Sequence, residues 1–170
     1  METGVKHRDI VLDIIEKYAS GADILDLGCG VGSTGSELAD TYHKYVGVDV
    51  SEVAIAKAKS APSSESRRSI THFVVGDVVT FEPETEYSII LFRESLYYCP
   101  ERNILLLLNR YSSYLTAEGV FIVRLHDRIK YQSIVQLIEG AYTVRERIAP
   151  ADGPFIILVF APPEKVAVRE

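Results

Sequence analysis

Apolar positions along this chain alternate between helical and strand-like spacing. The first apolar set recurs at helical spacing and stops at Gly21: Ile10, Val11, Ile14, Ile15 and Tyr18. Five strands are then predicted, over residues 23–27, 45–50, 71–76, 87–92 and 119–125. The third and fourth are near-continuous apolar runs, which are typical of parallel strands covered on both faces.

Helices are predicted between these strands, because the apolar spacing there returns to the helical period. They cover 33–42, the stretch from Ser51 to about residue 60, the stretch from Pro100 to Leu115, and the stretch from Asp127 to Gly140. Ser33 or Thr34, Ser51 and Asp127 are the expected caps, since short polar side chains accept free amides at a helix start. The polar stretch 60–69 is predicted to be a surface loop.

The last two strands, 142–148 and 155–160, are joined only by PADGP and should be antiparallel neighbours. The first carries the charges of an edge strand, and the second, FIILVF, should lie inside the sheet. We therefore predict the α/β class, with a single doubly wound Rossmann-like seven-stranded sheet, mostly parallel, ending in a C-terminal antiparallel hairpin. Residues 1–170 should form one domain with a core of about 7–162, a short N-terminal helix and no separate substrate domain.

Charge and cysteine content narrow the function classes. The 24 acidic and 18 basic residues give a net charge of −6, which argues against binding to a nucleic-acid backbone. No apolar run approaches the ~18 residues of a membrane span, and the N-terminal METGVKHRD lacks the apolar segment of a secretory signal. Cys29 and Cys99 form no CxxC pair, so we expect reduced thiols in a cytoplasmic protein and no metal site.

An acidic residue stands at or just beyond the end of every predicted parallel strand, where ligands bind in such sheets. Asp26 lies within DLGCGVG (26–32), Asp49 ends the second strand, and Asp77 follows the third. The fourth strand ends in Arg93 and Glu94 with Tyr97 and Tyr98 just beyond, and the fifth ends in His126 and Asp127.

Each of these residue types suits a ligand. Glycines let the chain turn sharply and a ligand approach its backbone, and the amides of the next helix point at that ligand. Asp49 is placed to accept from ribose hydroxyls, and Asp77 from an adenine amino group. The alternatives are that the glycines only form a turn, that Asp49 caps the next helix, or that Asp77 is an ordinary turn residue.

DLGCGVG, together with GVDVS (47–51) and VGDV (75–78), resembles the class I S-adenosylmethionine-dependent methyltransferases, over about residues 7–162. The resemblance implies that Asp26, Gly28, Gly30 and Gly32 hold the methionine end of S-adenosylmethionine, from which S-adenosylhomocysteine is the product. It implies that Asp49 binds the ribose and that Asp77 and Val78 border the adenine. Cys29, Val50 and Arg93 complete the predicted cofactor site.

Methyl transfer is an in-line displacement in which the protein aligns the reactants and, for an amine or hydroxyl acceptor, removes a proton. Glu94 and His126 are the candidate bases, and Tyr97 and Tyr98 the candidate pocket residues. The alternatives are an ion pair of Glu94 with Arg93 or Arg124, a structural His126, and tyrosines that only pack beneath the site. The expected acceptor is an oxygen or nitrogen of a small or medium-sized molecule, because RESLYY (93–98) lacks the NPPY type of sequence of nucleic-acid amino methyltransferases.

Two other functions stay open. Residues 30–35 also match GxGxxG, the pattern of an NAD-type oxidoreductase. A non-catalytic cofactor-binding subunit that completes a partner enzyme is the other. It remains open because only about 20 residues precede the first strand and the segment after the fifth strand is short. The pocket is therefore expected either to be open to a large or carrier-bound acceptor or to be closed by a homo-oligomer or partner.

Overall fold

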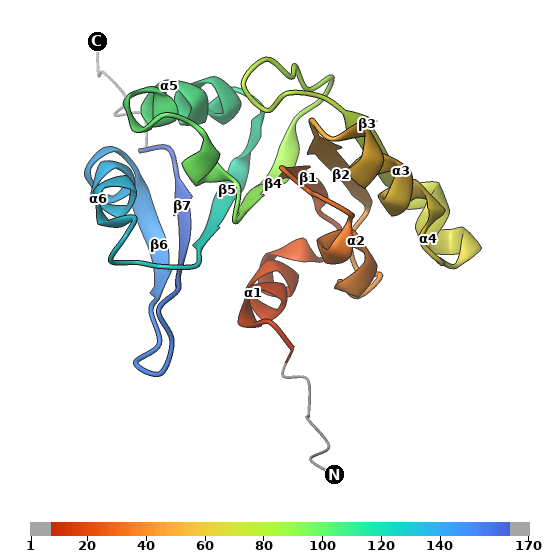
Figure 1. The fold of residues 1–170 in the computed structure, drawn as a ribbon, viewed down its shortest axis with the longest axis horizontal. Helices are drawn as coiled ribbons and strands as arrows, with labels where there is room; N and C mark the ends of the chain where they lie inside the picture. The colour runs from red at the N-terminus through yellow and green to blue at the C-terminus, as the bar shows by residue number, and fades with distance from the viewer. Residues whose placement is uncertain (1–7, 164–170) are drawn as a thin grey trace.

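The computed structural model describes residues 8–163, in which seven strands form one sheet in the order β3-β2-β1-β4-β5-β7-β6 (Figure 1). The strands β1 to β5 are parallel, whereas β7 is antiparallel to both β5 and β6. The predicted fold class, including the inserted final strand, is confirmed. The strands are β1 (Asp23–Leu27), β2 (Lys44–Asp49), β3 (Thr71–Val75), β4 (Tyr87–Arg93), β5 (Leu115–Leu125), β6 (Thr143–Ile148) and β7 (Ile156–Ala161).

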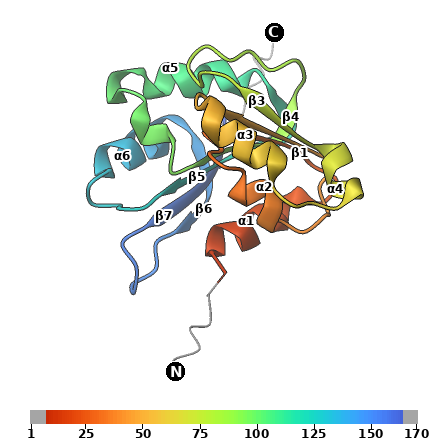
Figure 2. The same cartoon turned by 45° about the vertical axis from the view of Figure 1, so that its right-hand side comes forward.

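Helices cover both faces of this sheet (Figures 1 and 2). They are α1 (Ile10–Ala19), α2 (Ser33–Glu37), α3 (Glu52–Ser60), α4 (Glu65–Ile70), α5 (Glu101–Ser112) and α6 (Gln132–Ala141), with a short 3-10 helix η1 (Leu96–Tyr98). Helices α5 and α6 lie on one face and α1 on the other, so each face has its own apolar core.

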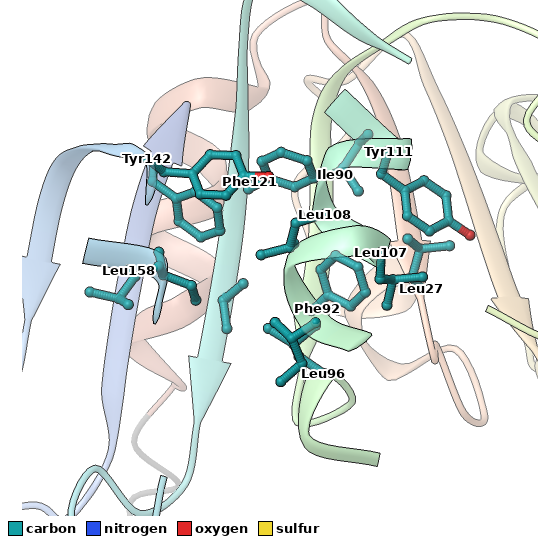
Figure 3. Packing of buried hydrophobic residues seen from close by; sticks show 14 of the residues in the cluster. Leu27, Ile90, Phe92, Leu96, Leu107, Leu108, Tyr111, Phe121, Tyr142 and Leu158 are labelled. Atoms are coloured by element: carbon teal, nitrogen blue, oxygen red, sulfur yellow. The ribbon is translucent and has the colours of Figure 1, made fainter. Parts of the chain in front are cut away.

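The core on the α5 side is rich in aromatic rings (Figure 3). Phe121 stacks on Phe160 with 5.2 Å between ring centroids, and Phe92 meets the edge of Tyr111 at 6.1 Å. On the opposite face, Leu12 and Ile15 of α1 pack against the same central strands. Burial of large apolar side chains on both faces is the main stabilising contribution in a layered fold of this kind.

The loops around α2 and α4 differ from the prediction. Helix α2 ends at Glu37 rather than at residue 42, because Tyr42 turns back into the core. Its N-cap is Gly32, without a capping side chain, instead of Ser33 or Thr34. Residues 65–70, expected to be loop, form α4, since Ser64 accepts from the Arg67 amide at 3.2 Å and so caps a helix.

Strand β3 is not covered on both faces as predicted. It pairs only with β2 at the edge of the sheet, and Val75 is 46% exposed. The prediction was correct for β4, which lies buried between β1 and β5. A run of apolar residues does not distinguish a central strand from an edge strand.

Two further element boundaries, the start of β5 and the start of α6, differ from the prediction because of hydrogen bonds. Leu115 begins β5, where it pairs with Tyr87, and does not continue α5. Asp127 accepts from the amides of Ile129 and Lys130 at 3.0 Å each, so it caps a turn, and α6 begins only at Gln132. Ser51 caps α3 as predicted, since its hydroxyl accepts from Ala54.

Within residues 8–163, no helix has both the length and the apolar character needed to cross a membrane. The same residues contain no cluster of three or more His, Cys, Asp or Glu side chains suited to a metal ion. Residues 1–7 lie outside the described residues, and with them the expectations for the N-terminus and for residue 7 as the start of the core.

Helix α5 holds the long loop between β3 and β4. The Tyr111 hydroxyl donates to the Val78 carbonyl at 2.6 Å, and the Arg110 guanidinium donates to the carbonyls of Val78 (2.9 Å) and Phe81 (2.7 Å). These bonds replace the ladder hydrogen bonds that a loop lacks. The position of Asp77 and Val78 therefore depends on α5.

Removing the Tyr111 hydroxyl should loosen this loop. We expect Tyr111→Phe to lower the free energy of unfolding by about 0.5–1.5 kcal/mol, because one hydrogen bond to a partly buried carbonyl is lost while the ring remains. Tyr114→Phe is the matched control, since Tyr114 packs near Tyr111 but holds neither carbonyl. Urea unfolding followed by circular dichroism measures both, and equal losses in the two variants would contradict the role of this bond.

Candidate active site

The carboxyl ends of β1, β2 and β4 meet at Gly28. Its amide donates to the Val48 carbonyl at 2.8 Å, and its φ of +82° is a left-handed conformation that favours glycine. A Cβ at this position would lie 2.4 Å from the Cβ of Ser95, whose hydroxyl bonds to the Leu27 carbonyl at 2.5 Å. Only glycine permits the β1 loop to approach the end of β4 this closely.

Asp49 at the end of β2 fixes the glycine-rich loop. Its Oδ2 accepts from the Gly30 amide at 2.8 Å, and its Oδ1 accepts from the Ser51 amide at 2.9 Å. The N-cap of α3 is Ser51, so the alternative that Asp49 caps this helix is wrong. Each carboxylate oxygen can accept a further bond, so Asp49 presents an anionic acceptor beside the backbone of the loop.

Asp77 follows β3 and faces the same space as Asp49. Its Oδ1 accepts from the Val79 amide at 2.8 Å, which makes it a turn residue as well as a cavity residue. The apolar side chains of Val50, Val78 and Val79 line the cavity beside the two carboxylates. Such a mixture of apolar walls and a few polar groups is typical of a small-molecule site.

A cavity of about 420 Å³ lies over these strand ends. Its lining includes seven of the predicted site residues: Gly28, Asp49, Val50, Asp77, Val78, Glu94 and Tyr98. The sequence reasoning missed the other seven: Val79, Phe92, Ser95, Leu96, Cys99, Pro100 and Leu107. Most of these residues follow β4 directly. Their position just beyond a strand end, after Glu94, is the sequence signal by which they could have been predicted.

Asp26 lies beneath the loop rather than in the cavity wall. It is 1% exposed, its Oδ2 accepts from the Tyr45 hydroxyl, and its Oδ1 has no hydrogen-bond partner within the described part of the chain. Burial raises the pKa of Asp26 to about 6, although the Tyr45 hydroxyl and the charge of Arg93 act in the opposite direction.

The other predicted cofactor residues do not line the cavity. Arg93 points toward the start of α1, where it bonds to Asp9 at 2.9 Å and Thr34 at 3.1 Å. Cys29 is buried, and burial raises the pKa of its thiol. Gly30 and Gly32 shape the loop from outside the lining.

Glu94 is tied into a network of charges at the end of β4. Its carboxylate accepts from the Arg124 guanidinium, from the His126 amide at 2.9 Å and from His126 Nδ1 at 3.0 Å. The alternative of an ion pair with Arg124 is therefore present, together with a contact to His126. Glu94 is the one residue other than glycine with a positive φ, +59°, among those described, a strained conformation that often marks functional sites.

Tyrosine rings surround His126. Tyr97 and Tyr131 stack in parallel with centroids 4.5 Å apart, and His126 meets their edges at 5.3 and 5.2 Å. Burial raises the pKa of Tyr97, and the charge of Glu94 adds to the effect. Tyr97 does not line the cavity, whereas Tyr98 is 81% exposed and lines it.

Comparisons with known proteins identify the family to which the chain belongs. Residues 24–119 match a protein family described as a methyltransferase domain. A stretch of 71 residues is 35% identical to the 2-heptyl-1-hydroxyquinolin-4(1H)-one methyltransferase of Mycobacteroides abscessus; it makes up 42% of this chain and 31% of that protein. The match thus spans about a third of that relative's length.

Solved structures share the fold. The N-methyltransferase NodS from Bradyrhizobium japonicum WM9 superimposes with a TM-score of 0.73 at 19% identity, covering 91% of this chain and 94% of that chain. The CcbJ methyltransferase from Streptomyces caelestis gives 0.78 at 14% identity, with 91% and 88% covered. At such identities the similarity concerns the fold alone.

The buried carboxylate should make stability depend on pH. Because the pKa of Asp26 is raised on folding, ionisation destabilises the folded state as the pH rises from 4 through 6. We expect the free energy of unfolding of Asp26→Asn to rise, relative to that of the wild type, by up to about 3 kcal/mol between pH 4 and pH 7. Urea unfolding at both pH values measures this difference.

The control is Asp152→Asn, which removes one negative charge from an exposed loop. Its difference from the wild type should stay the same at the two pH values. If the difference in free energy of unfolding between Asp26→Asn and the wild type is also independent of pH, ionisation of Asp26 does not destabilise the folded state.

Proposed function

Because the chain belongs to the methyltransferase domain family, we propose that it transfers the methyl group of S-adenosylmethionine to an oxygen or nitrogen of a small or medium-sized acceptor. The observation that carries this proposal is the cavity in which Gly28, Asp49 and Asp77 lie together over the strand ends. The name of the Mycobacteroides relative, which states a hydroxylated quinolone, supports a small acceptor with a hydroxyl group.

The residues present fit the cofactor. Asp26 Oδ1 is a buried acceptor without a partner in the described residues, and a Cβ at Gly30 would meet no atom within 4 Å, which leaves open space above the loop. In this proposal Asp26 and the loop amides hold the methionine end, Asp49 holds the ribose, and Asp77 with Val78 borders the adenine. When bound, S-adenosylmethionine supplies the activated methyl group.

Glu94 and His126 are proposed to handle the acceptor proton. The Glu94 carboxylate holds His126 at Nδ1, which assigns the proton of the neutral imidazole to Nδ1 and leaves Nε2 as an acceptor. Nε2 would then accept the proton of the acceptor O–H or N–H group, whereas S-adenosylmethionine, when bound, would supply the methyl group and leave as S-adenosylhomocysteine. Glu94, already engaged by Arg124, acts as a positioning residue rather than as the base.

The binding experiment is a calorimetric titration with S-adenosylhomocysteine, with NADH as the control ligand. Micromolar binding of S-adenosylhomocysteine alone is the expected result. Saturable binding of NADH without binding of S-adenosylhomocysteine would overturn the proposal in favour of a dinucleotide enzyme. Binding without turnover of any acceptor in a broad panel would favour a non-catalytic subunit.

Loss of the Asp49 carboxylate should weaken cofactor binding. We expect Asp49→Ala to raise the dissociation constant for S-adenosylhomocysteine by about 10- to 100-fold, because hydrogen bonds to a charged group contribute about 1.5–3 kcal/mol. Asp23→Ala is the control, since Asp23 begins β1 and pairs with His43 away from the cavity. An unchanged affinity in Asp49→Ala would remove Asp49 from the site.

Substitution of the proposed base should lower the rate. With any acceptor that turns over, we expect His126→Asn to lower kcat by about 10²- to 10⁴-fold. Glu94→Gln should give a smaller loss, because the ring stays but its orientation is less well held.

His126→Asn should still bind S-adenosylhomocysteine like the wild type, because His126 does not line the cofactor cavity, and this separates a catalytic defect from a folding defect. Initial rates measure the loss in both variants. Wild-type rates in His126→Asn would reject His126 as the base and leave the enzyme proposal intact.

A further inference from the structure

A second hollow, of about 370 Å³, adjoins the candidate cofactor cavity. The two share Tyr98, Cys99 and Pro100 as lining residues, and Tyr97 and Tyr131 also line the second hollow. We refer to this second space as the tyrosine hollow. It is open to solvent along Tyr98, which is 81% exposed.

His126 contacts residues that line each of the two spaces. Glu94, which holds His126 Nδ1, lines the cofactor cavity, and the His126 ring contacts Tyr97 and Tyr131, which line the tyrosine hollow. The His126 side chain is half-exposed. A molecule in the tyrosine hollow therefore lies near both the proposed base and the cofactor cavity.

We propose that the tyrosine hollow binds the acceptor and selects a flat aromatic ring that carries an ionisable hydroxyl; this rests on the proposed methyl transfer. The Tyr97 ring lies 4.9 Å from the Tyr98 ring and 4.5 Å from the Tyr131 ring between centroids, and the exposed Tyr98 ring offers a surface on which a flat ring can stack. An exposed tyrosine beside a hollow is available for such a contact.

The charges in the hollow favour a neutral or anionic acceptor over a cation. The Lys130 ammonium lies 5.2 Å from the centre of the Tyr131 ring, so the position for a cation over that ring is already taken. Glu101, the acid that lines the hollow, is engaged by the Ser133 hydroxyl at 2.7 Å. Lys130 also lines the hollow and is the cation available there to stabilise an oxyanion.

The test uses three bicyclic probes with the protein saturated with S-adenosylhomocysteine. 2-Naphthol is flat and acidic, decahydro-2-naphthol has the same skeleton without flat rings, and 2-(aminomethyl)naphthalene is flat but cationic. Calorimetry should detect saturable binding of 2-naphthol and at least roughly tenfold weaker binding of the other two, because the saturated probe cannot stack and the cationic probe meets the charge of Lys130. Equal binding of the saturated or cationic probe would overturn the proposed selectivity.

Variants then locate the binding. Tyr98→Ser and Tyr131→Leu should each weaken 2-naphthol binding by about five- to tenfold, and in methyl-transfer assays Tyr98→Ser should raise KM with little change in kcat. Leu106→Ser is the control, because Leu106 is an exposed apolar residue on α5 outside both spaces. Wild-type binding in both tyrosine variants would overturn the assignment of the hollow.

S-adenosylhomocysteine affinity separates this proposal from the proposed function. If the protein binds S-adenosylhomocysteine but none of the three probes, the acceptor class is wrong and the cofactor site stands. If S-adenosylhomocysteine itself does not bind, the proposed function is wrong, and the acceptor proposal that rests on it is wrong as well.

Discussion

Strands β1 and β4 pair with each other in the sheet, yet the helices that follow them pack on opposite faces. The chain leaving β1 enters the face of α1, and the chain leaving β4 enters the face of α5. A crevice must open between two such connections, and ligands bind there in doubly wound sheets. The contact of Gly28 with Ser95 forms the floor of this crevice, and the cavity residues from β2, β3 and β4 are arranged around it.

Several groups around this crevice are unfavourable for stability alone. Asp26 is an acid buried with one oxygen unpaired, and Glu94 holds a left-handed backbone conformation that costs roughly 1 kcal/mol or more. Neither is needed to close the apolar core, in which large side chains such as Phe92 and Phe121 pack efficiently. Their place beside the cavity is consistent with groups retained for binding and catalysis.

The hydrophobic pattern predicted the seven strands well because each strand buries a continuous apolar surface. It did not distinguish the edge strand β3 from the central strand β4, since both consist of apolar residues and only their neighbours differ. Helix α4 was missed because its polar sequence carries no apolar stripe, and its Ser64 cap was the only local signal. Sequence patterns predict an element correctly where its buried residues recur at the spacing of a helix or a strand.

The sequence by itself determined the order of strands and helices, the glycine-rich turn, and the acids at the strand ends, because these depend on residue type and spacing along one segment. Tertiary structure alone decided which of these groups share a space. Arg93 turned toward Asp9 and away from the cavity, while Glu94 met Arg124 and His126 from a different strand. Side-chain direction and pairing across strands depend on packing between distant segments, and no spacing in the sequence records that packing.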